Sequence, residues 1–156
     1  MNITEEQKAD ILLAMLEHRY GAIERIRDRV YGFAIWTLGI FLGVTGLVLE
    51  GTLQPGPTGR WVLSFAAFLA LAAIVFYIRD LEKGFCNQLR VAIRVETLLG
   101  FYETGVYDSA GGLYPASWAS AGTAAGQGRF FRMTYLLLCL GAAVLVVTVS
   151  LAGMAF

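Results

Sequence analysis

Three long runs without a charged residue dominate the order of apolar and polar positions along this chain. They cover residues 30–49, 61–78 and 133–156. Each has about 18 residues or more, which is the length that a helix rising about 1.5 Å per residue needs to cross a hydrocarbon core of about 30 Å. Lipid offers the backbone no hydrogen-bond partners, and three spans cannot close a barrel, so the runs predict three transmembrane helices.

The segment before the first run predicts a helix that continues into the membrane. Thr4 and Gln7 have the spacing of a capping box, which marks a helix start. Apolar positions then recur at intervals of three and four residues, as on one helical face: Leu12, Leu16, Tyr20, Ile23, Ile26 and Val30. We therefore expect one long helix over 4–49, with Gly21 as its weakest point.

The link at 50–60 is rich in Gly and Pro and predicts a turn, so the first two spans form an antiparallel hairpin. After residue 78 the chain keeps a helical pattern to about residue 103, with an apolar side that is expected to pack on the helix over 4–29. Residues 104–128 contain many Gly and Ala and predict a loop at the membrane surface. The predicted fold class is an all-α membrane protein, a single integral membrane domain over 1–156 in which the first and second spans have helical cytoplasmic extensions.

Basic residues predict the orientation. Five precede the first span and six lie between the second and third spans, whereas Arg60 alone lies between the first and second. By the positive-inside rule, the N-terminus and the segment 79–132 are cytoplasmic and the C-terminus is outside, as expected for a multi-pass protein of the inner (plasma) membrane. Apolar residues make up 57% of the chain and the mean hydropathy is +0.62, in agreement with this class.

Four glycines of the first span share one helical side, and we call them the glycine face: Gly32, Gly39, Gly43 and Gly46. Gly39 and Gly43 form the G-x-x-x-G spacing that lets helix backbones approach closely in lipid. Two interpretations stay open. The glycine face is a seam for self-association or for lining a pore, or it packs inside one subunit against Ala66, Ala70 and Ala73.

The candidate chemistry is sparse. The three runs contain no Asp, Glu, Lys, Arg or His, which argues against a pump or an ion-coupled carrier. A pore remains compatible, with five polar side chains as candidate lining: Thr37, Thr45, Ser64, Thr148 and Ser150. His18 lies on a charged helix, and no metal-ligand spacing, nucleophile motif or phosphate-binding loop occurs. We therefore expect no enzyme activity, no cofactor and no metal site.

Six basic side chains of the expected cytoplasmic helices form what we call the basic face: Arg25, Arg27, Arg29, Lys83, Arg90 and Arg94. Such residues bind anionic lipid head groups, an anionic ligand or an acidic protein partner, or they only set the topology. The formal net charge is zero, which argues against nucleic acid as a partner.

A charged N-terminal helix, a two-span hairpin and a charged helical extension starting at Arg79-Asp80-Leu81-Glu82-Lys83 occur together in this chain. Over residues 10–103 this arrangement resembles the bacterial SLATT-type membrane effectors associated with nucleotide-signal defence systems. The third span departs from their two-span pattern. The resemblance implies an oligomer that perturbs the membrane.

The leading hypothesis is a small homo-oligomeric membrane protein, pore-like or channel-like, whose cytoplasmic helices act as gate or sensor. Three helices in one subunit enclose no conduit, so this function requires assembly. The alternative is a non-conducting accessory or adaptor protein whose cytoplasmic helices dock a protein partner.

Overall fold

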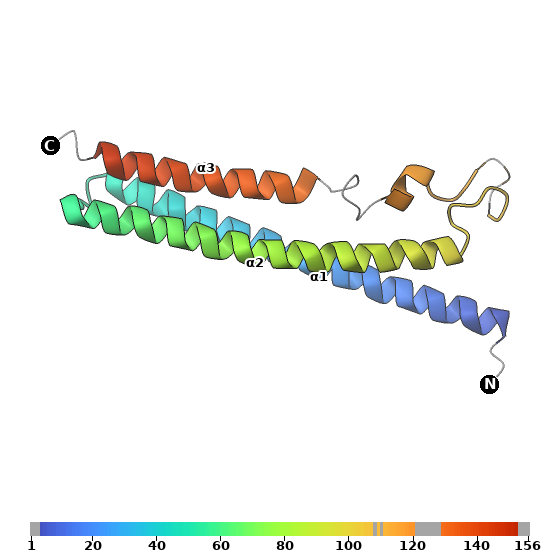
Figure 1. Ribbon diagram of the computed structural model, residues 1–156. Coiled ribbons are helices and arrows are strands. Elements are labelled where there is room, and N and C mark those ends of the chain that lie inside the picture. Colours follow the sequence, from blue (N-terminus) through green and yellow to red (C-terminus); the bar gives the residue numbers. More distant parts are fainter. Residues whose placement is uncertain (1–3, 108, 110, 121–128, 153–156) are drawn as a thin grey trace. The chain divides into compact units, whose positions relative to one another are not determined.

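The chain is helical in a computed structural model that describes residues 4–107, 109, 111–120 and 129–152. The elements are α1 (Glu5–Leu49), α2 (Pro57–Leu98), the short 3₁₀ helix η1 (Ala116–Ser120) and α3 (Arg129–Leu151), as Figure 1 shows. The helices α1, α2 and α3 are each long and apolar enough to cross a membrane. This confirms the predicted all-α class with three candidate spans.

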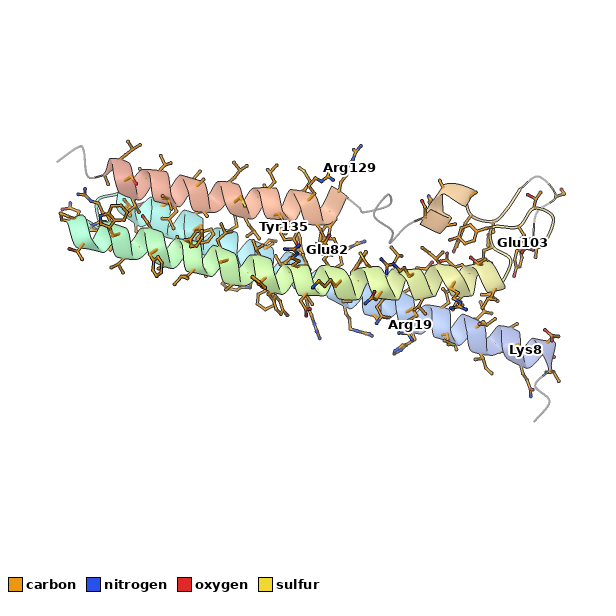
Figure 2. All side chains as sticks on the ribbon, in the orientation of Figure 1. Lys8, Arg19, Glu82, Glu103, Arg129 and Tyr135 are labelled. Atoms are coloured by element: carbon orange, nitrogen blue, oxygen red, sulfur yellow. The ribbon has the colours of Figure 1, made fainter. Side chains whose placement is uncertain are left out.

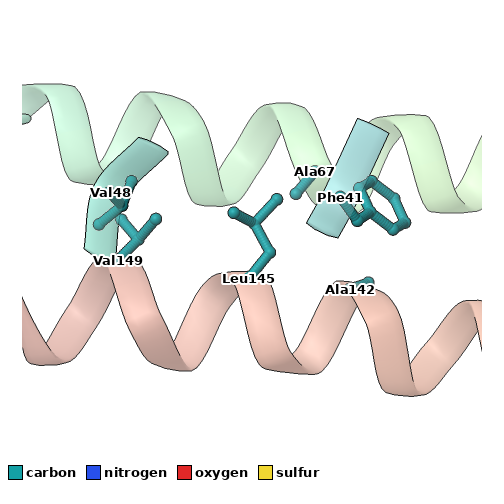
Figure 3. Packing of buried hydrophobic residues seen from close by; sticks show 6 residues of the cluster. All are labelled: Phe41, Val48, Ala67, Ala142, Leu145 and Val149. Carbon is teal, nitrogen blue, oxygen red and sulfur yellow. The ribbon is translucent and has the colours of Figure 1, made fainter. Parts of the chain in front are cut away.

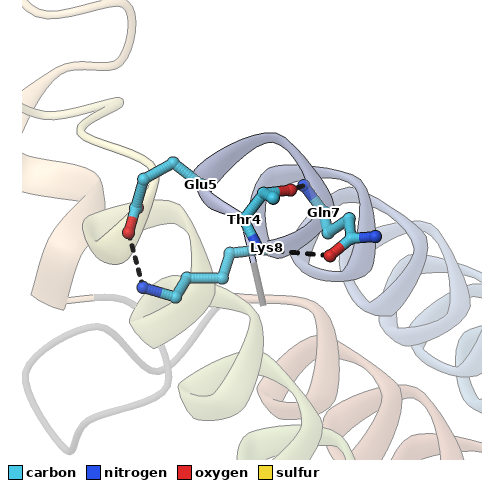
Figure 4. A network of polar contacts seen from close by, with 4 residues as sticks. All are labelled: Thr4, Glu5, Gln7 and Lys8. Atoms are coloured by element: carbon cyan, nitrogen blue, oxygen red, sulfur yellow. Dashed lines mark hydrogen bonds and ion pairs between the residues drawn. The ribbon is translucent and has the colours of Figure 1, made fainter. Parts of the chain in front are cut away.

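Helix α1 is continuous through Gly21, as the sequence predicts. Its first turn carries the expected capping box, in which the Thr4 amide donates to Gln7 Oε1 at 3.1 Å and the Gln7 amide donates to Thr4 Oγ1 at 3.3 Å (Figure 4). Lys8 Nζ also lies 2.6 Å from Glu5 Oε1. The two hydrogen bonds between Thr4 and Gln7 satisfy amides that the helix itself leaves without partners, and so they fix its start.

Helix α2 begins with Pro57, a residue favoured in the first helical turn, and ends at Leu98. The prediction of a helix to about residue 103 is therefore wrong by several residues. The reason is Gly100, whose φ of 76° is left-handed. The Phe101 amide donates to the Glu96 carbonyl and the Gly100 amide donates to the Thr97 carbonyl, each at 3.1 Å, which is the pattern of a glycine-terminated helix end.

The third helix begins at Arg129, four residues before the predicted start at 133, and ends at Leu151. The predicted span continues to residue 156, of which residues 153–156 lie outside the described part. The predicted loop at 104–128 contains η1, and its residues 121–128 also lie outside that part.

The chain divides into two units. We call residues 1–28 and 81–128 the charged unit, and residues 29–80 and 129–156 the apolar unit. Helices α1 and α2 each run through both units, with one part in the charged unit and one part in the apolar unit.

In the apolar unit, α3 packs against α1 and α2. Its buried residues recur every three to four positions: Phe131, Thr134, Leu138, Gly141, Ala142, Leu145 and Val149. Three of them, Ala142, Leu145 and Val149, meet Phe41 and Val48 of α1 and Ala67 of α2 in one apolar cluster (Figure 3). In the same unit, the rings of Phe33 from α1 and Tyr77 from α2 pack edge to face with centroids 4.7 Å apart.

The outward sides of the apolar unit are as apolar as its interior. Only 11% of the most apolar window of α2 is buried, and Trp36, Trp61 and Phe76 are 75–80% exposed. Water would strongly disfavour so large a continuous apolar surface, whereas lipid does not. The exposed side chains therefore agree with a multi-pass membrane protein.

In the charged unit, α1 and α2 pair along positions spaced alternately by three and four residues. Leu16, Ala92, Val95 and Phe101 form its buried cluster. Tyr20, predicted on the packing side, is 41% exposed. Its hydroxyl still reaches α2, and its neighbour Arg19 also lies at the α1–α2 contact, where Arg19 Nη1 donates to Gln88 Oε1 at 2.6 Å (Arg19 is labelled in Figure 2).

Candidate functional site

The glycine face of α1 has no neighbour in the described structure. Gly39 and Gly43 are exposed, and Gly32 and Gly46 are half-buried. A Cβ atom built on any of the four meets nothing within 4 Å. The fold therefore leaves this side of the helix open.

The open side lies opposite the side that α1 uses inside the subunit. Thr37, Phe41 and Thr45 are buried. Gly39 lies two residues from Thr37 and Phe41, and Gly43 lies two residues from Phe41 and Thr45. A step of two residues rotates the side chain by about 200° around a helix. The glycine face therefore points away from the contacts of α1 within the apolar unit.

The interpretation of these glycines as packing within one subunit is wrong for this structure. Its proposed partners Ala66, Ala70 and Ala73 are all exposed on α2. The buried side of α2 in the apolar unit carries Ala67 and Ile78 instead. The physical reason is that the large side chains of Phe41 and Val48 fill the contact of α1 with its neighbours, and such packing is the chief attraction between helices in lipid.

A different glycine, which the sequence pattern did not single out, makes the close helix contact. A Cβ atom on Gly141 of α3 would lie 2.6 Å from Leu38 Cδ1 and 3.5 Å from Phe41 Cδ2. The signal for it is the run of small residues Gly141-Ala142-Ala143 in the middle of the third span. That run has no G-x-x-x-G spacing, so the motif did not reveal it.

Two of the five candidate pore-lining side chains lie inside the subunit. Thr37 and Thr45 are buried, and their hydroxyls donate to the carbonyl oxygens of Phe33 and Phe41, each at 2.7 Å. A threonine in an apolar helix satisfies its hydroxyl in this way. These two residues are therefore not available to line a conduit.

All six residues of the basic face are exposed, but they do not form one face. Lys83, Arg90 and Arg94 follow the outer side of α2 at spacings of seven and four residues. On α1, each step from Arg25 to Arg27 and from Arg27 to Arg29 rotates the side-chain direction by about 200°. Arg27 therefore points to the other side of α1 from Arg25 and Arg29. Arg29 belongs to the apolar unit, whereas the other five belong to the charged unit.

A buried carboxylate in the charged unit is the polar feature that sequence reasoning missed. Glu96 is 4% exposed. Its Oε1 accepts the hydroxyl hydrogen of Tyr20 from α1, and its Oε2 accepts that of Tyr102 from the segment after α2. One side chain thus connects three segments of the unit. The signal was an acidic residue at an apolar position of the α2 pattern, next to Val95.

Aromatic rings enclose this carboxylate at the end of α2. Phe101 packs edge to face on Tyr107 and Tyr114, with centroids 5.5 and 5.4 Å apart. Tyr102 and Trp118 also contact Tyr114. Tyr107, Tyr114 and Trp118, which all belong to the segment predicted as a loop, are therefore part of an aromatic cluster within the charged unit.

Burial raises the pKa of Tyr20 and of Tyr102 above the ordinary tyrosine value, and the hydrogen bond to Glu96 and the negative charge of that carboxylate raise it further. Both phenols therefore stay protonated and keep donating. This geometry stabilises the unit.

Among the residues that the structure describes, no group of three or more His, Cys, Asp and Glu side chains is arranged to hold a metal ion. His18 is exposed on α1. The open glycine face is thus the feature of the described residues that bears most directly on function.

No protein-family model, curated protein or solved structure matches this chain.

Proposed function

We propose that this protein forms a homo-oligomer in the membrane, that its copies associate through the glycine face of α1, and that the assembly is pore-like. The observation that carries the proposal is the open side at Gly39 and Gly43, opposite the buried Phe41.

The physics of lipid supports a contact at this side. Two apolar surfaces gain little by leaving lipid for each other, so close packing is the chief attraction between helices. Glycine permits the closest approach of two backbones. A side of α1 with four glycines, at which a Cβ atom would meet none of the described residues within 4 Å, is therefore suited to a second copy of α1.

A pore follows from assembly rather than from one subunit. The three helices of one apolar unit pack on one another around an apolar cluster. A conduit requires several such units around an axis. The resemblance to SLATT-type effectors supports the same type of assembly.

The charged unit serves as gate or sensor in this proposal. The positive-inside rule places it in the cytoplasm. Because α1 and α2 are continuous through both units, a change of their pairing in the charged unit is transmitted along the same two helices.

Two measurements test this function. The mass of the purified protein in mild detergent and in nanodiscs should be a defined multiple of 17.0 kDa. Planar bilayers containing the protein should show discrete conductance steps. A monomer under all of these conditions contradicts the assembly, and an oligomer without conductance contradicts the pore.

An adaptor function is the second candidate, and a groove in the charged unit favours it. The groove has a volume of about 600 Å³ between the start of α1 and the end of α2. Ile11, Leu98 and Tyr107 line it and are 51–67% exposed. Exposed apolar side chains outside the membrane favour binding of a protein partner, because the partner removes their surface from water.

Substitution separates the two functions. If the protein is an adaptor, planar bilayers containing the parent chain should show no conductance steps, and Leu98→Asp should abolish binding of a protein partner. A partner that still binds the Leu98→Asp variant contradicts docking at this groove. Exposed Leu13→Asp on the same unit provides the matched control.

A further inference from the structure

A second pocket lies in the apolar unit, at the end where α2 begins and α3 finishes. It has a volume of about 320 Å³. Six residues from the two helices line it: Pro57, Arg60, Trp61, Ser64, Val146 and Ser150. The lining thus combines a guanidinium and two hydroxyls with the apolar side chains of Pro57, Trp61 and Val146.

Arg60 is unusual by its place in the chain. Eleven of the twelve Lys and Arg residues precede the first span or follow the second, as the positive-inside rule requires, and Arg60 is the exception. Topology therefore does not explain this charge. Among the described residues it forms no salt bridge with an acidic side chain.

The backbone orients the Arg60 side chain. Arg60 is half-buried, and its Nε donates to the Pro55 carbonyl oxygen at 3.1 Å. A guanidinium has five N–H donors, so this bond leaves the terminal nitrogens for another acceptor. A planar fork of this kind matches two oxygens of a phosphate group.

The level of the pocket in the membrane determines which class of phosphate-containing ligand fits it. Trp61 begins the apolar run 61–78 and is 80% exposed, as expected for a ring at the boundary between head groups and hydrocarbon. Below it, Val146 provides an apolar wall. A ligand that matches this lining needs a phosphate group at the level of Arg60 and an apolar chain that packs beside α3.

From this geometry we propose that the pocket binds a membrane phospholipid, with its phosphate on Arg60 and the Ser64 hydroxyl and an acyl chain along Val146. The site is independent of the oligomer proposed above, since none of its residues belongs to the glycine face.

Native mass spectrometry of the full chain in detergent tests the site with three probes: a phosphatidylglycerol, a diacylglycerol with the same chains, and free glycerol phosphate. Phosphatidylglycerol should bind, and the other two should bind at least about tenfold more weakly, which is the size of one charge-assisted contact. Equal binding of diacylglycerol overturns the role of the phosphate. Equal binding of glycerol phosphate overturns the assignment to a lipid.

Substitutions locate the binding. Arg60→Gln should weaken phosphatidylglycerol binding about tenfold, and Arg60→Lys should weaken it less, because lysine keeps the charge without the fork. Arg132→Gln is the control, an exposed arginine near the start of α3. Equal losses for Arg60→Gln and Arg132→Gln overturn the proposal.

Arg60→Gln also removes the hydrogen bond to Pro55, so a second variant is needed. Ser64→Leu fills the pocket and leaves Arg60 unchanged. It should weaken binding as well, with the helix signal in circular dichroism unaltered. Binding that is insensitive to Ser64→Leu contradicts this location.

Discussion

A Cβ atom on Gly141 would lie 2.6 Å from Leu38 Cδ1, closer than two non-bonded carbon atoms can stand. The missing side chain at Gly141 therefore leaves the room that the end of the Leu38 side chain occupies between α1 and α3. Leu38 and Phe41 are the nearest groups to Gly141, and both belong to α1.

Gly141→Leu should destabilise the apolar unit by about 1–3 kcal/mol, because the added side chain has to displace Leu38 and Phe41. Ala143→Leu is the matched control, since Ala143 is exposed on the same helix. Unfolding in mixed detergent micelles, followed by circular dichroism, measures both. Equal stability of the two variants would show that α3 does not approach α1 at Gly141.

Gly112→Ala should loosen the aromatic cluster at the end of α2. A Cβ atom there would lie 2.8 Å from both C and O of Tyr102, and a backbone cannot move aside as a side chain end can. At the adjacent Gly111 a Cβ atom meets nothing within 4 Å. Hydrogen exchange at the end of α2 should therefore accelerate in Gly112→Ala and remain normal in Gly111→Ala, and acceleration in neither would contradict this packing.

The charged unit should lose stability in alkali. Burial and Glu96 raise the pKa of Tyr20 and Tyr102 above the value of about 10 for an unfolded tyrosine. Below pH ~10 the folded and the unfolded chain both keep the two phenol protons, and the stabilisation by these hydrogen bonds is fully present. Above pH ~10 the unfolded chain releases phenol protons that the folded chain retains, so the free energy of unfolding falls as the pH rises.

The double variant Tyr20→Phe with Tyr102→Phe should be less stable at neutral pH, because Glu96 loses both donors. It should also show a smaller decrease in thermal midpoint between neutral pH and about pH 11 than the parent chain. Lysines titrate in the same range, and the comparison of the two proteins removes their contribution. An identical decrease in both would contradict protonated phenols at Glu96.

The sequence predicts the helices well because their signals are local. Run length, the capping box at Thr4 and the turn at Pro57 each act within a few residues. The end of α2 was predicted too late, since the pattern after residue 98 stays apolar and only the left-handed Gly100 stops the helix.

The sites were harder to predict, because they depend on which helix sides meet. A glycine spacing looks the same whether it faces a neighbour or lipid, and only the buried Phe41 shows that Gly39 and Gly43 face outward. In the same way, the partners of Glu96 are 76 and six residues away in the sequence. A periodic pattern contains no information on such pairs.

The most direct test of the proposed assembly compares two double substitutions that both introduce leucine. Gly39→Leu with Gly43→Leu adds bulk to the glycine face, and Ala66→Leu with Ala70→Leu adds it at the same spacing to an exposed side of α2. Nothing lies within 4 Å of a Cβ atom at Gly39 or Gly43, so the subunit should fold in both cases.

Crosslinking in membranes measures whether the oligomer forms. The glycine variant should lose the oligomer while the alanine variant keeps it, with the helix signal of both unchanged. An oligomer ladder that persists in Gly39→Leu with Gly43→Leu would contradict association through this side of α1.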